Sequence, residues 1–295
     1  MYLAGPYLLG ITAAAPGSSA TLPSTPFAPA TADHPVTVAR LLLSLTFLFY
    51  FTLPANLMVY GVNDICDYET DRVNPKKTDY EALVGPAERP ALVRALLICS
   101  LPFVPLLAFA PVTARAFLAA FVFLSVFYSA PPIRAKARPL IDSAFNILYA
   151  MPGFFAYALA GVGVPSWHVV AAAACWTMAM HAFSAVPDIT ADLSAGIATA
   201  ATLLGRTRTI TVCLLLYAIA AALEFHDLGG VALALGAVYM ILMTLALRAK
   251  ASQYAPVTDG PDSGVMRIYR WFPAINTVSG AVIFVTVFFS KHLSM

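Results

Sequence analysis

Long runs of apolar residues, separated by shorter polar connections, follow one another along almost the whole chain. Several runs approach 20 residues without a charged side chain, which is the length that an α-helix needs to cross a lipid bilayer. The pattern therefore predicts an all-α fold, a polytopic membrane helix bundle of about nine transmembrane helices. The expected segments are 2–16, 36–62, 91–110, 113–130, 140–162, 167–187, 209–225, 228–247 and 270–290.

The start of the chain and its prolines modify this pattern. The first segment is short for a span and has no polar residues before it, so we expect either a stub helix or an incomplete N-terminus. Pro54, Pro102, Pro105 and Pro152 lie inside predicted spans, and we expect kinks there that neighbouring helices tolerate. No second soluble region interrupts the pattern, so residues 1–295 are expected to form a single domain.

The composition agrees with a membrane protein. Of the 295 residues, 60% are hydrophobic and only 11% are charged, whereas a soluble domain carries about 25% charged residues. A net charge of +2 is too small to suggest a nucleic-acid partner. The four cysteines lie far apart and form no CxxC pair, so neither a disulfide framework nor a zinc site is indicated for them.

The positive charges are distributed unevenly between the connections. The segments 63–90, 131–139, 188–208 and 248–269 hold twelve Lys and Arg residues, whereas 17–35, 111–112, 163–166 and 226–227 hold none. The two sets alternate along the chain, and the positive-inside rule places the charged set in the cytoplasm. We therefore expect a multi-pass protein of the cell (inner) membrane whose active-site loops are cytoplasmic.

The stretch NDICDYETD follows an apolar run and begins at Asn63. On a helix, at about 100° per residue, Asn63, Asp64, Asp67 and Asp71 share one face, while Glu69 points away. Like charges at this spacing repel unless a cation binds them. Carboxylate and amide oxygens suit Mg²⁺, which proteins often hold against a phosphate. The alternative is a solvated helix end, but the four-residue repeat on an apolar helix and the cost of acids beside a membrane favour a site.

A second acidic pair occurs in DITAD, where Asp188 and Asp192 are four residues apart and share a helix face. Gly196 and Gly205 follow in a stretch of small residues. The predicted topology puts this pair on the same membrane side as the first motif. Two such clusters on one side of a membrane could hold two or more Mg²⁺ ions against one diphosphate.

Polar and basic residues of the connections are candidates for contact with phosphate. Arg and Lys side chains both bind phosphate oxygens, and Tyr128 and Ser129 end a predicted span as hydrogen-bond donors. The alternative is that the basic residues only reflect the positive-inside rule. The candidates for binding the diphosphate are Arg72, Lys76, Lys77, Tyr128, Ser129, Arg134 and Lys136.

Asp142 and Asn146 follow in the same stretch, four residues apart and just inside the next span. Asp142 either caps the start of that helix or supplies a polar group beside the acceptor. A diphosphate whose charge is neutralised by metal and basic side chains is a good leaving group. If the carbon that the diphosphate leaves is allylic, a stabilised cation results, which an aromatic carbon or an alkene can attack.

These residues resemble the UbiA superfamily of membrane prenyltransferases. NDICDYETD matches the family motif NDxxDxxxD, DITAD matches DxxxD, and YSAPPIRAK is similar to its Tyr-Ser-x-Pro-Pro loop with a following Lys. The resemblance implies Mg²⁺ as cofactor and an isoprenyl diphosphate, dimethylallyl or longer, as donor. It implies metal ligands at Asn63, Asp64, Asp67, Asp71, Asp188 and Asp192, with diphosphate contacts from Tyr128, Lys136 and one or more of Arg72, Lys76 and Lys77. The polar N-terminal segment of the family, often with an Arg, is not found here, so a phosphate contact is missing or lies upstream.

Within that family the loop sequences look most like the lycopene elongase branch, which implies a lipophilic, lycopene-like carotenoid as acceptor. The spans also offer few polar groups to orient a phenolic or carboxylated ring. The carboxylates expected to act in catalysis are Asp67, Asp71, Asp188, Asp192 and Asp142, the last by steering the cation left on the acceptor. An aromatic acceptor of quinone, haem or chlorophyll biosynthesis is the alternative.

Three other classes of protein are less consistent with the chain. A transporter would place acids near the middle of its spans, whereas these lie at the ends. A membrane CDP-alcohol phosphotransferase needs a DG-x2-AR motif, which is absent from the sequence. A soluble isoprenyl diphosphate synthase is excluded by the apolar runs.

Two further sets of polar residues, at 224–227 and at His181, are interpreted as structural and not as functional sites. Glu224, His226 and Asp227 lie in a predicted outer turn, and a solvated turn is favoured over a metal site. His181 lies seven residues before Asp188 and hence on nearly the same helix face. We favour a packed histidine there over one that faces the substrate cavity.

Overall fold

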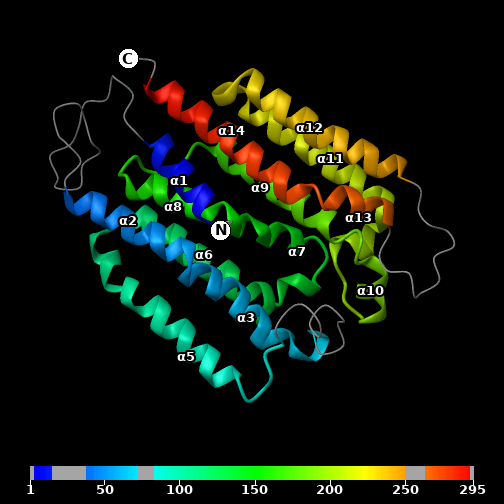
Figure 1. Cartoon of the computed structure of the whole chain (residues 1–295), viewed down its shortest axis with the longest axis horizontal. Helices are drawn as coiled ribbons and strands as arrows, with labels where there is room; N and C mark the ends of the chain where they lie inside the picture. The colour runs from blue at the N-terminus through cyan, green and yellow to red at the C-terminus, as the bar shows by residue number, and fades with distance from the viewer. Residues whose placement is uncertain (1–2, 15–37, 72–82, 250–262, 293–295) are drawn as a thin grey trace. The chain divides into compact units, whose positions relative to one another are not determined.

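The structure is a computed structural model that describes residues 3–14, 38–71, 83–249 and 263–292, although not the side chains of 69–71, 263 and 292. All the regular elements of the described residues are helices, which confirms the predicted all-α membrane fold (Figure 1). Six helical stretches of the described residues are long and apolar enough to cross a membrane. They are Val38–Tyr68, Arg89–Phe109, Val112–Ser129, Ala200–Leu228, Gly230–Arg248 and Gly264–Lys291.

Each of the nine predicted segments coincides with helical structure, but three of them fall outside those six spans. The first is a ten-residue helix, α1 (Ala4–Ala13). The segment predicted at 140–162 is divided between α7 (Ile141–Ala144), a 3₁₀ turn and α8 (Met151–Leu159). The third is α9 (Trp167–Ser184), which contains two histidines. The count of nine is therefore approximate.

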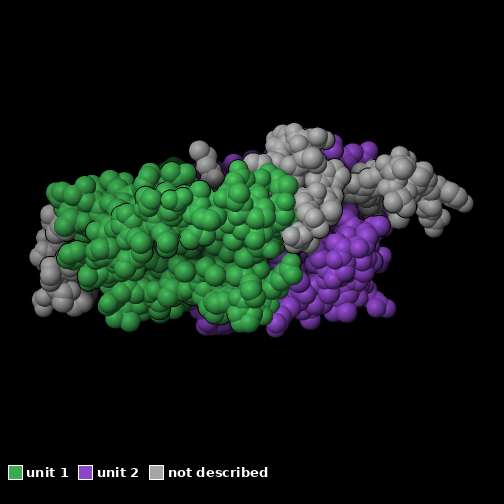
Figure 2. All heavy atoms as spheres, turned by 90° about the horizontal axis from the view of Figure 1, so that it is seen from below, with its two compact units in different colours: residues 1–134, 148–165, 287–295 green, residues 135–147, 166–286 purple. Residues whose placement is uncertain are grey.

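By its internal contacts the chain divides into two compact units (Figure 2). Unit 1 comprises residues 1–134, 148–165 and 287–295, and unit 2 comprises 135–147 and 166–286. The first acidic motif belongs to unit 1 and the second to unit 2. The single domain expected from the sequence stays a prediction.

Unit 1 contains α1, α8 and four longer elements: α2 (Val38–Thr52), α3 (Pro54–Asp71), α5 (Arg89–Ser100) and α6 (Val112–Ser129). Prolines interrupt its helices where the sequence predicts kinks. Leu53 separates α2 from α3, which begins at Pro54. After α5 the chain continues as two short 3₁₀ helices that contain Pro102 and Pro105, because a proline ring removes a helical hydrogen bond and clashes with the preceding turn.

The core of unit 1 is aromatic. Phe47, Phe51 and Phe155 are fully buried, and the rings of Phe47 and Phe155 lie 4.8 Å apart. The hydroxyl of the buried Tyr7 donates to the backbone carbonyl of Ser44 at 2.8 Å, which ties α1 to α2. Helices α1 and α8 also pack closely, because both carry glycine where their backbones meet, at positions 10 and 153. A side chain at either glycine would overlap the opposite backbone.

Unit 2 is built on α9, α11 (Ala200–Leu228) and α12 (Gly230–Arg248), together with α10 (Ile189–Ser194), α13 (Ser263–Tyr269) and most of α14 (Phe272–His292). Helix α11 packs against both α9 and α12. It extends well beyond the predicted 209–225 and therefore includes the supposed outer turn at 226–227. Gly205 lies inside it with φ of 71° and ψ of 166°, which breaks the helix after its first turns.

Helices α11 and α12 meet through small and aromatic residues. Tyr217 and Tyr239 stack with their ring centroids 4.6 Å apart, and the hydroxyl of Tyr239 donates to Asn276 Oδ1 at 2.8 Å. Gly236 of α12 lies directly against Ala221 of α11, where a larger residue would not fit. These contacts join α11 to α12 and α12 to α14.

One face of α2 carries large apolar side chains that remain exposed. Leu41, Leu42, Leu45 and Phe49 each expose more than half of their surface, at 52%, 57%, 51% and 55%. Exposed apolar faces of this kind are unusual on a soluble protein. In a bilayer they would contact lipid tails, as expected for a helix that spans it.

Candidate active site

The first acidic motif occupies the last turns of α3, which runs without interruption from Pro54 to Asp71. The helix that the spacing predicts over 63–71 is therefore present. Asp67 is 2% exposed, and Asn63 and Asp64 are half-buried. The side chains of Glu69 and Asp71 lie outside the described residues, so their directions stay predictions from the helical repeat.

Asn63 is fixed by a residue of the neighbouring span. The hydroxyl of Ser129, at the end of α6, donates to Asn63 Oδ1 at 3.1 Å. Ser129 is itself buried, at 1% exposure. The predicted diphosphate ligand Ser129 thus contacts a predicted metal ligand, and the bond orients the amide of Asn63 while leaving its oxygen a second lone pair.

The basic candidates fall into two groups. Arg72, Lys76 and Lys77 lie outside the described residues, and their roles remain predictions. Arg134 lies in the turn after α6 with a φ of 45°, a conformation that side chains rarely adopt. Lys136 lies in a short 3₁₀ helix at 135–137 and close enough to Asp192 to lower the pKa of that carboxyl.

The second acidic motif is a short helix and its entry. Asp188 is the N-cap residue of α10, and its backbone carbonyl accepts a hydrogen bond from the N–H of Asp192 at 2.8 Å. Burial, and after it the nearby carboxylates of Asp188 and Asp142, raise the pKa of Asp192 to about 6. Lys136 and a hydrogen bond from Thr199 act in the opposite direction. The motif is therefore a set of acids that repel one another.

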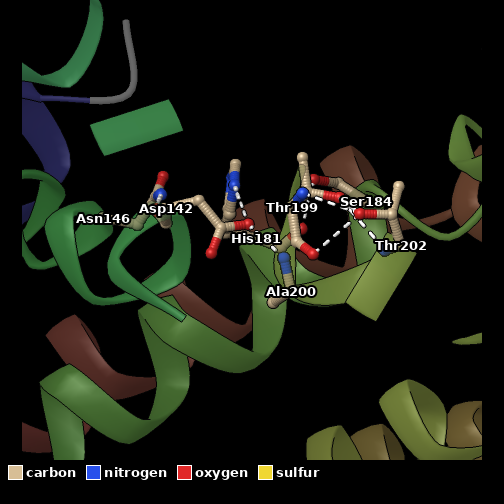
Figure 3. A network of polar contacts seen from close by, with 7 residues as sticks. All are labelled: Asp142, Asn146, His181, Ser184, Thr199, Ala200 and Thr202. Atoms are coloured by element: carbon tan, nitrogen blue, oxygen red, sulfur yellow. Dashed lines mark hydrogen bonds and ion pairs between the residues drawn. The ribbon is translucent and has the colours of Figure 1, made fainter. Parts of the chain in front are cut away.

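Asp142 is at the centre of a buried network in unit 2 (Figure 3). Its Oδ2 accepts from the backbone N–H of Ala200, the first residue of α11, at 2.9 Å. His181 Nε2 of α9 lies 3.8 Å from the same oxygen, and the side-chain amide of Asn146 donates to the Asp142 carbonyl at 2.7 Å. Asp142 Oδ1 is buried and has no hydrogen-bond partner among the described residues.

This network corrects the idea that Asp142 caps its own helix. Helix α7 has no side-chain cap, whereas the Asp142 carboxylate binds the start of α11, 58 residues further along the chain. Thr199 completes that helix start, because its hydroxyl accepts from the N–H of Thr202 and the Thr202 hydroxyl accepts in return from the N–H of Thr199. His181 lies against Asp142, rather than being only a packed histidine as the sequence favours.

Both motifs have donor sets that fit Mg²⁺. The second presents carboxylates that lie close enough to raise the pKa of Asp192, and the first presents carboxylates and an amide oxygen at helical spacing. Burial and the neighbouring carboxylates make ionisation of Asp192 unfavourable, and a divalent cation would offset that repulsion. In each unit the donors are hard oxygens, which suits Mg²⁺ rather than a thiophilic metal.

Two hydrogen bonds of this site join residues that are far apart in the sequence, so no local pattern predicts them. The N–H of Ala200 is a backbone group with no side-chain signal. Its pairing with Asp142 depends on how α7 and α11 pack, and no local motif encodes that contact. The bond between Ser129 and Asn63 joins residues 66 positions apart for the same reason.

Comparison with known proteins gives related sequences that cover most of the chain. Lycopene elongase/hydratase of Haloferax volcanii is 40% identical over 284 residues, which are 96% of this chain and 83% of the relative. Lycopene elongase/hydratase of Corynebacterium glutamicum is 30% identical over 241 residues, 80% of this chain and 82% of the relative.

Solved structures with the same fold include a UbiA homolog from Archaeoglobus fulgidus bound to GPP and Mg²⁺, with a TM-score of 0.61 and 18% identity over 97% of this chain and 95% of that one. The apo structure of a UbiA homolog from Aeropyrum pernix K1 has a TM-score of 0.64 and 18% identity, and the match covers 97% of this chain and 96% of that one. The model of the UbiA prenyltransferase family matches residues 5–265. With that match and relatives of up to 40% identity, the chain belongs to the UbiA prenyltransferase family.

Proposed function

We propose that this prenyltransferase moves an allylic isoprenyl group from its diphosphate to a carotenoid in the membrane, with dimethylallyl diphosphate as donor and lycopene as acceptor. The observation that carries the proposal is 40% identity, over 96% of the chain, to a protein named lycopene elongase/hydratase. The two acidic motifs and the apolar spans fit a diphosphate and a polyene. The family match over 5–265 supports treating residues 1–295 as one catalytic domain.

The donor's diphosphate would be held by metal and by basic side chains. The proposed Mg²⁺ ligands are Asn63, Asp64, Asp67, Asp71, Asp188 and Asp192. Mg²⁺, when bound, supplies positive charge that favours departure of the diphosphate. Tyr128, Ser129, Arg134, Lys136 and one or more of Arg72, Lys76 and Lys77 are proposed to contact its oxygens, since cationic and hydroxyl donors stabilise charge that develops on a leaving group. A relative of known structure carries GPP and Mg²⁺, which supports this assignment.

The acceptor half of the reaction would need few polar groups. When the C–O bond of the donor breaks, its allylic carbon becomes a cation, and an alkene carbon at the end of the polyene forms the new C–C bond. A tertiary cation remains on the acceptor, and it must lose a proton to a base or capture water. Asp142 is the proposed group that steers this step, because it holds a buried carboxylate oxygen with no hydrogen-bond partner among the described residues.

The reaction is tested by co-expressing the protein with a lycopene-producing pathway, in a host without longer carotenoids, and analysing the pigments by mass. New species heavier by one or two five-carbon units are expected, and Asp142→Asn should change their ratio or their hydroxylation. If lycopene stays unmodified while an aromatic acid or quinone precursor becomes prenylated in the same membranes, the carotenoid proposal fails.

The protein is an integral, multi-pass membrane protein, and we propose that it lies in the cell membrane with both acidic motifs on the cytoplasmic side. The distribution of Lys and Arg supports this orientation. In a variant without native cysteines, single cysteines at Thr78 and Ser194 should react with an impermeant thiol reagent only from the cytoplasmic side, and one at Ser19 only from outside. Labelling of Ser19 and Ser194 from the same side would contradict it.

A further inference from the structure

A second cluster of metal-ligating side chains lies in unit 2, where the start of α9 meets the end of α11. His168 is the second residue of α9, and His226 and Asp227 lie in the last turn of α11. His168 Nε2 is 3.1 Å from Asp227 Oδ2, and His226 Nδ1 is 2.7 Å from Asp227 Oδ1. The sequence suggests only a solvated turn here, because His168 is 59 residues away from Asp227.

The arrangement of the donor atoms matches a metal site. One ligand atom from each of the three residues lies within 4.8 Å of the other two. Two ligands on a tetrahedral Zn²⁺, each at about 2.0–2.1 Å, are separated by roughly 3.3 Å. The distances from Asp227 to the two histidines, 3.1 Å to His168 Nε2 and 2.7 Å to His226 Nδ1, are close to that value. Small side-chain rotations would therefore admit an ion. Two imidazoles and a carboxylate suit Zn²⁺ and its neighbours in the transition series, and not Mg²⁺.

The surroundings of the cluster also favour a cation. Glu224, one turn before Asp227 on α11, is near enough to His168 and Asp227 to interact with both electrostatically. Its Oε1 is buried and has no hydrogen-bond partner among the described residues. The side chain of His226 is 84% exposed and that of Asp227 41%. An ion held here would therefore have room for a water molecule as its fourth ligand.

We propose that His168, His226 and Asp227 bind one divalent transition-metal cation of the Zn²⁺ type, which links the start of α9 to the end of α11. The site is distinct from the acidic motifs. His168 and His181 are thirteen residues apart on α9, so the cluster lies about 20 Å along that helix from the Asp142 network. Because the ligands come from two helices that pack together, the ion would staple this helix pair at the end opposite to the second acidic motif.

The test uses the full-length protein in detergent after removal of metals with EDTA. The Asp67→Asn/Asp188→Asn variant serves as the background, since it weakens Zn²⁺ binding at the acidic motifs. When Zn²⁺ is added to this background variant, about one equivalent should stay bound through gel filtration. With Co²⁺ as the probe, the variant should show the visible absorption of tetrahedral Co²⁺. It should also unfold at a higher temperature with Zn²⁺ than without.

Three further variants decide the outcome. In that background His168→Gln/Asp227→Asn should lose the bound equivalent, the Co²⁺ spectrum and the thermal shift. His226→Gln alters only an exposed side chain, so its fold should be unaffected, and it should weaken Zn²⁺ binding by about tenfold or more. His181→Gln, a histidine elsewhere on α9, should bind Zn²⁺ as the background does. Equal Zn²⁺ binding in the background and in His168→Gln/Asp227→Asn would overturn the proposal, as would a background that binds none.

Discussion

The first acidic motif stands on consecutive turns of one long helix, α3, whereas the second is the six-residue helix α10 and the residue before it. In α3 the helical backbone sets the common face of Asn63, Asp64 and Asp67, and the hydroxyl of Ser129 on α6 adds a hydrogen bond to Asn63. Around α10 residues from other parts of unit 2 set the charge balance: Lys136 and Thr199 stabilise the Asp192 carboxylate, whereas Asp142 repels it.

The difference shows two ways of placing carboxylates for the same kind of ligand. A continuous helix fixes the relative directions of its side chains through the 3.6-residue repeat. A short helix has little stability of its own, so its position depends on tertiary contacts. Substitutions should therefore act locally in the first motif and through neighbouring residues in the second.

The largest expected effect is the loss of prenyl transfer when either motif loses a proposed metal ligand. Asp67→Asn and Asp188→Asn should each remove most prenyl transfer while the protein still inserts in membranes, because each removes a proposed ligand from a metal whose effect is worth several kcal/mol. EDTA should abolish transfer, and Mg²⁺ or Mn²⁺ should restore it. Transfer of a labelled isoprenyl group in membranes measures both. Glu69→Gln is the matched control, and an equal loss at Glu69 and Asp67 would contradict the helical-face argument.

A smaller effect, on protein stability, is expected for Asp142, which binds the start of α11 beside the second motif. Asp142→Ala removes the acceptor for the N–H of Ala200 and should destabilise the protein by about 1 kcal/mol, as for the loss of a helix cap. Asp142→Asn keeps an oxygen that can accept the same bond and should unfold closer to the wild type. Thermal unfolding followed by circular dichroism measures both, and equal destabilisation by the two variants would mean that the charge, and not the bond, holds α11.

Ser129→Ala tests the hydrogen bond that joins α6 to the first motif. Loss of a hydrogen bond of about 1 kcal/mol predicts roughly a fivefold rise in the Mg²⁺ concentration needed for half-maximal activity. Ser125→Ala is the control, because Ser125 is also buried in α6 and its hydroxyl has no hydrogen-bond partner among the described residues. The same rise in both variants would show that α6 packing, and not the bond to Asn63, is responsible.

The smallest expected effect concerns pH. The pKa of Asp192 is about 6, so without metal its carboxyl takes up a proton as the pH falls through this value, and Mg²⁺ binding to the second motif should weaken. Lys136 lowers that pKa, and Lys136→Gln should therefore move the loss of binding to higher pH. Mg²⁺ titrations of the Asp67→Asn variant, followed by calorimetry between pH 5 and 8, measure the shift. Arg138→Gln, on the same connection, should leave the profile in place.

The sequence is sufficient to predict the parts of the molecule that depend on local geometry. Apolar run lengths predict the helices, and the four-residue spacing in 63–71 predicts that the motif continues a span. The predicted range of α11, 209–225, was too short, because the first turns and the last turn of Ala200–Leu228 are too polar to be distinguished from connections. The contact of Asp142 with Ala200 and that of His168 with Asp227 depend on which helices pack together, and one sequence does not encode this in any local pattern.

The break at Gly205 has a consequence for insertions and deletions. On α3 a residue added between Pro54 and Asn63 would rotate the whole acidic face by about 100° relative to the rest of the span. On α11 the helical repeat is already interrupted at Gly205, so a change of length between Gly196 and Gly205 need not alter the register in which residues 206–228 pack against α9 and α12. The connection from the second motif to its span can therefore vary in length without rotating that span, whereas the helix that carries the first motif cannot.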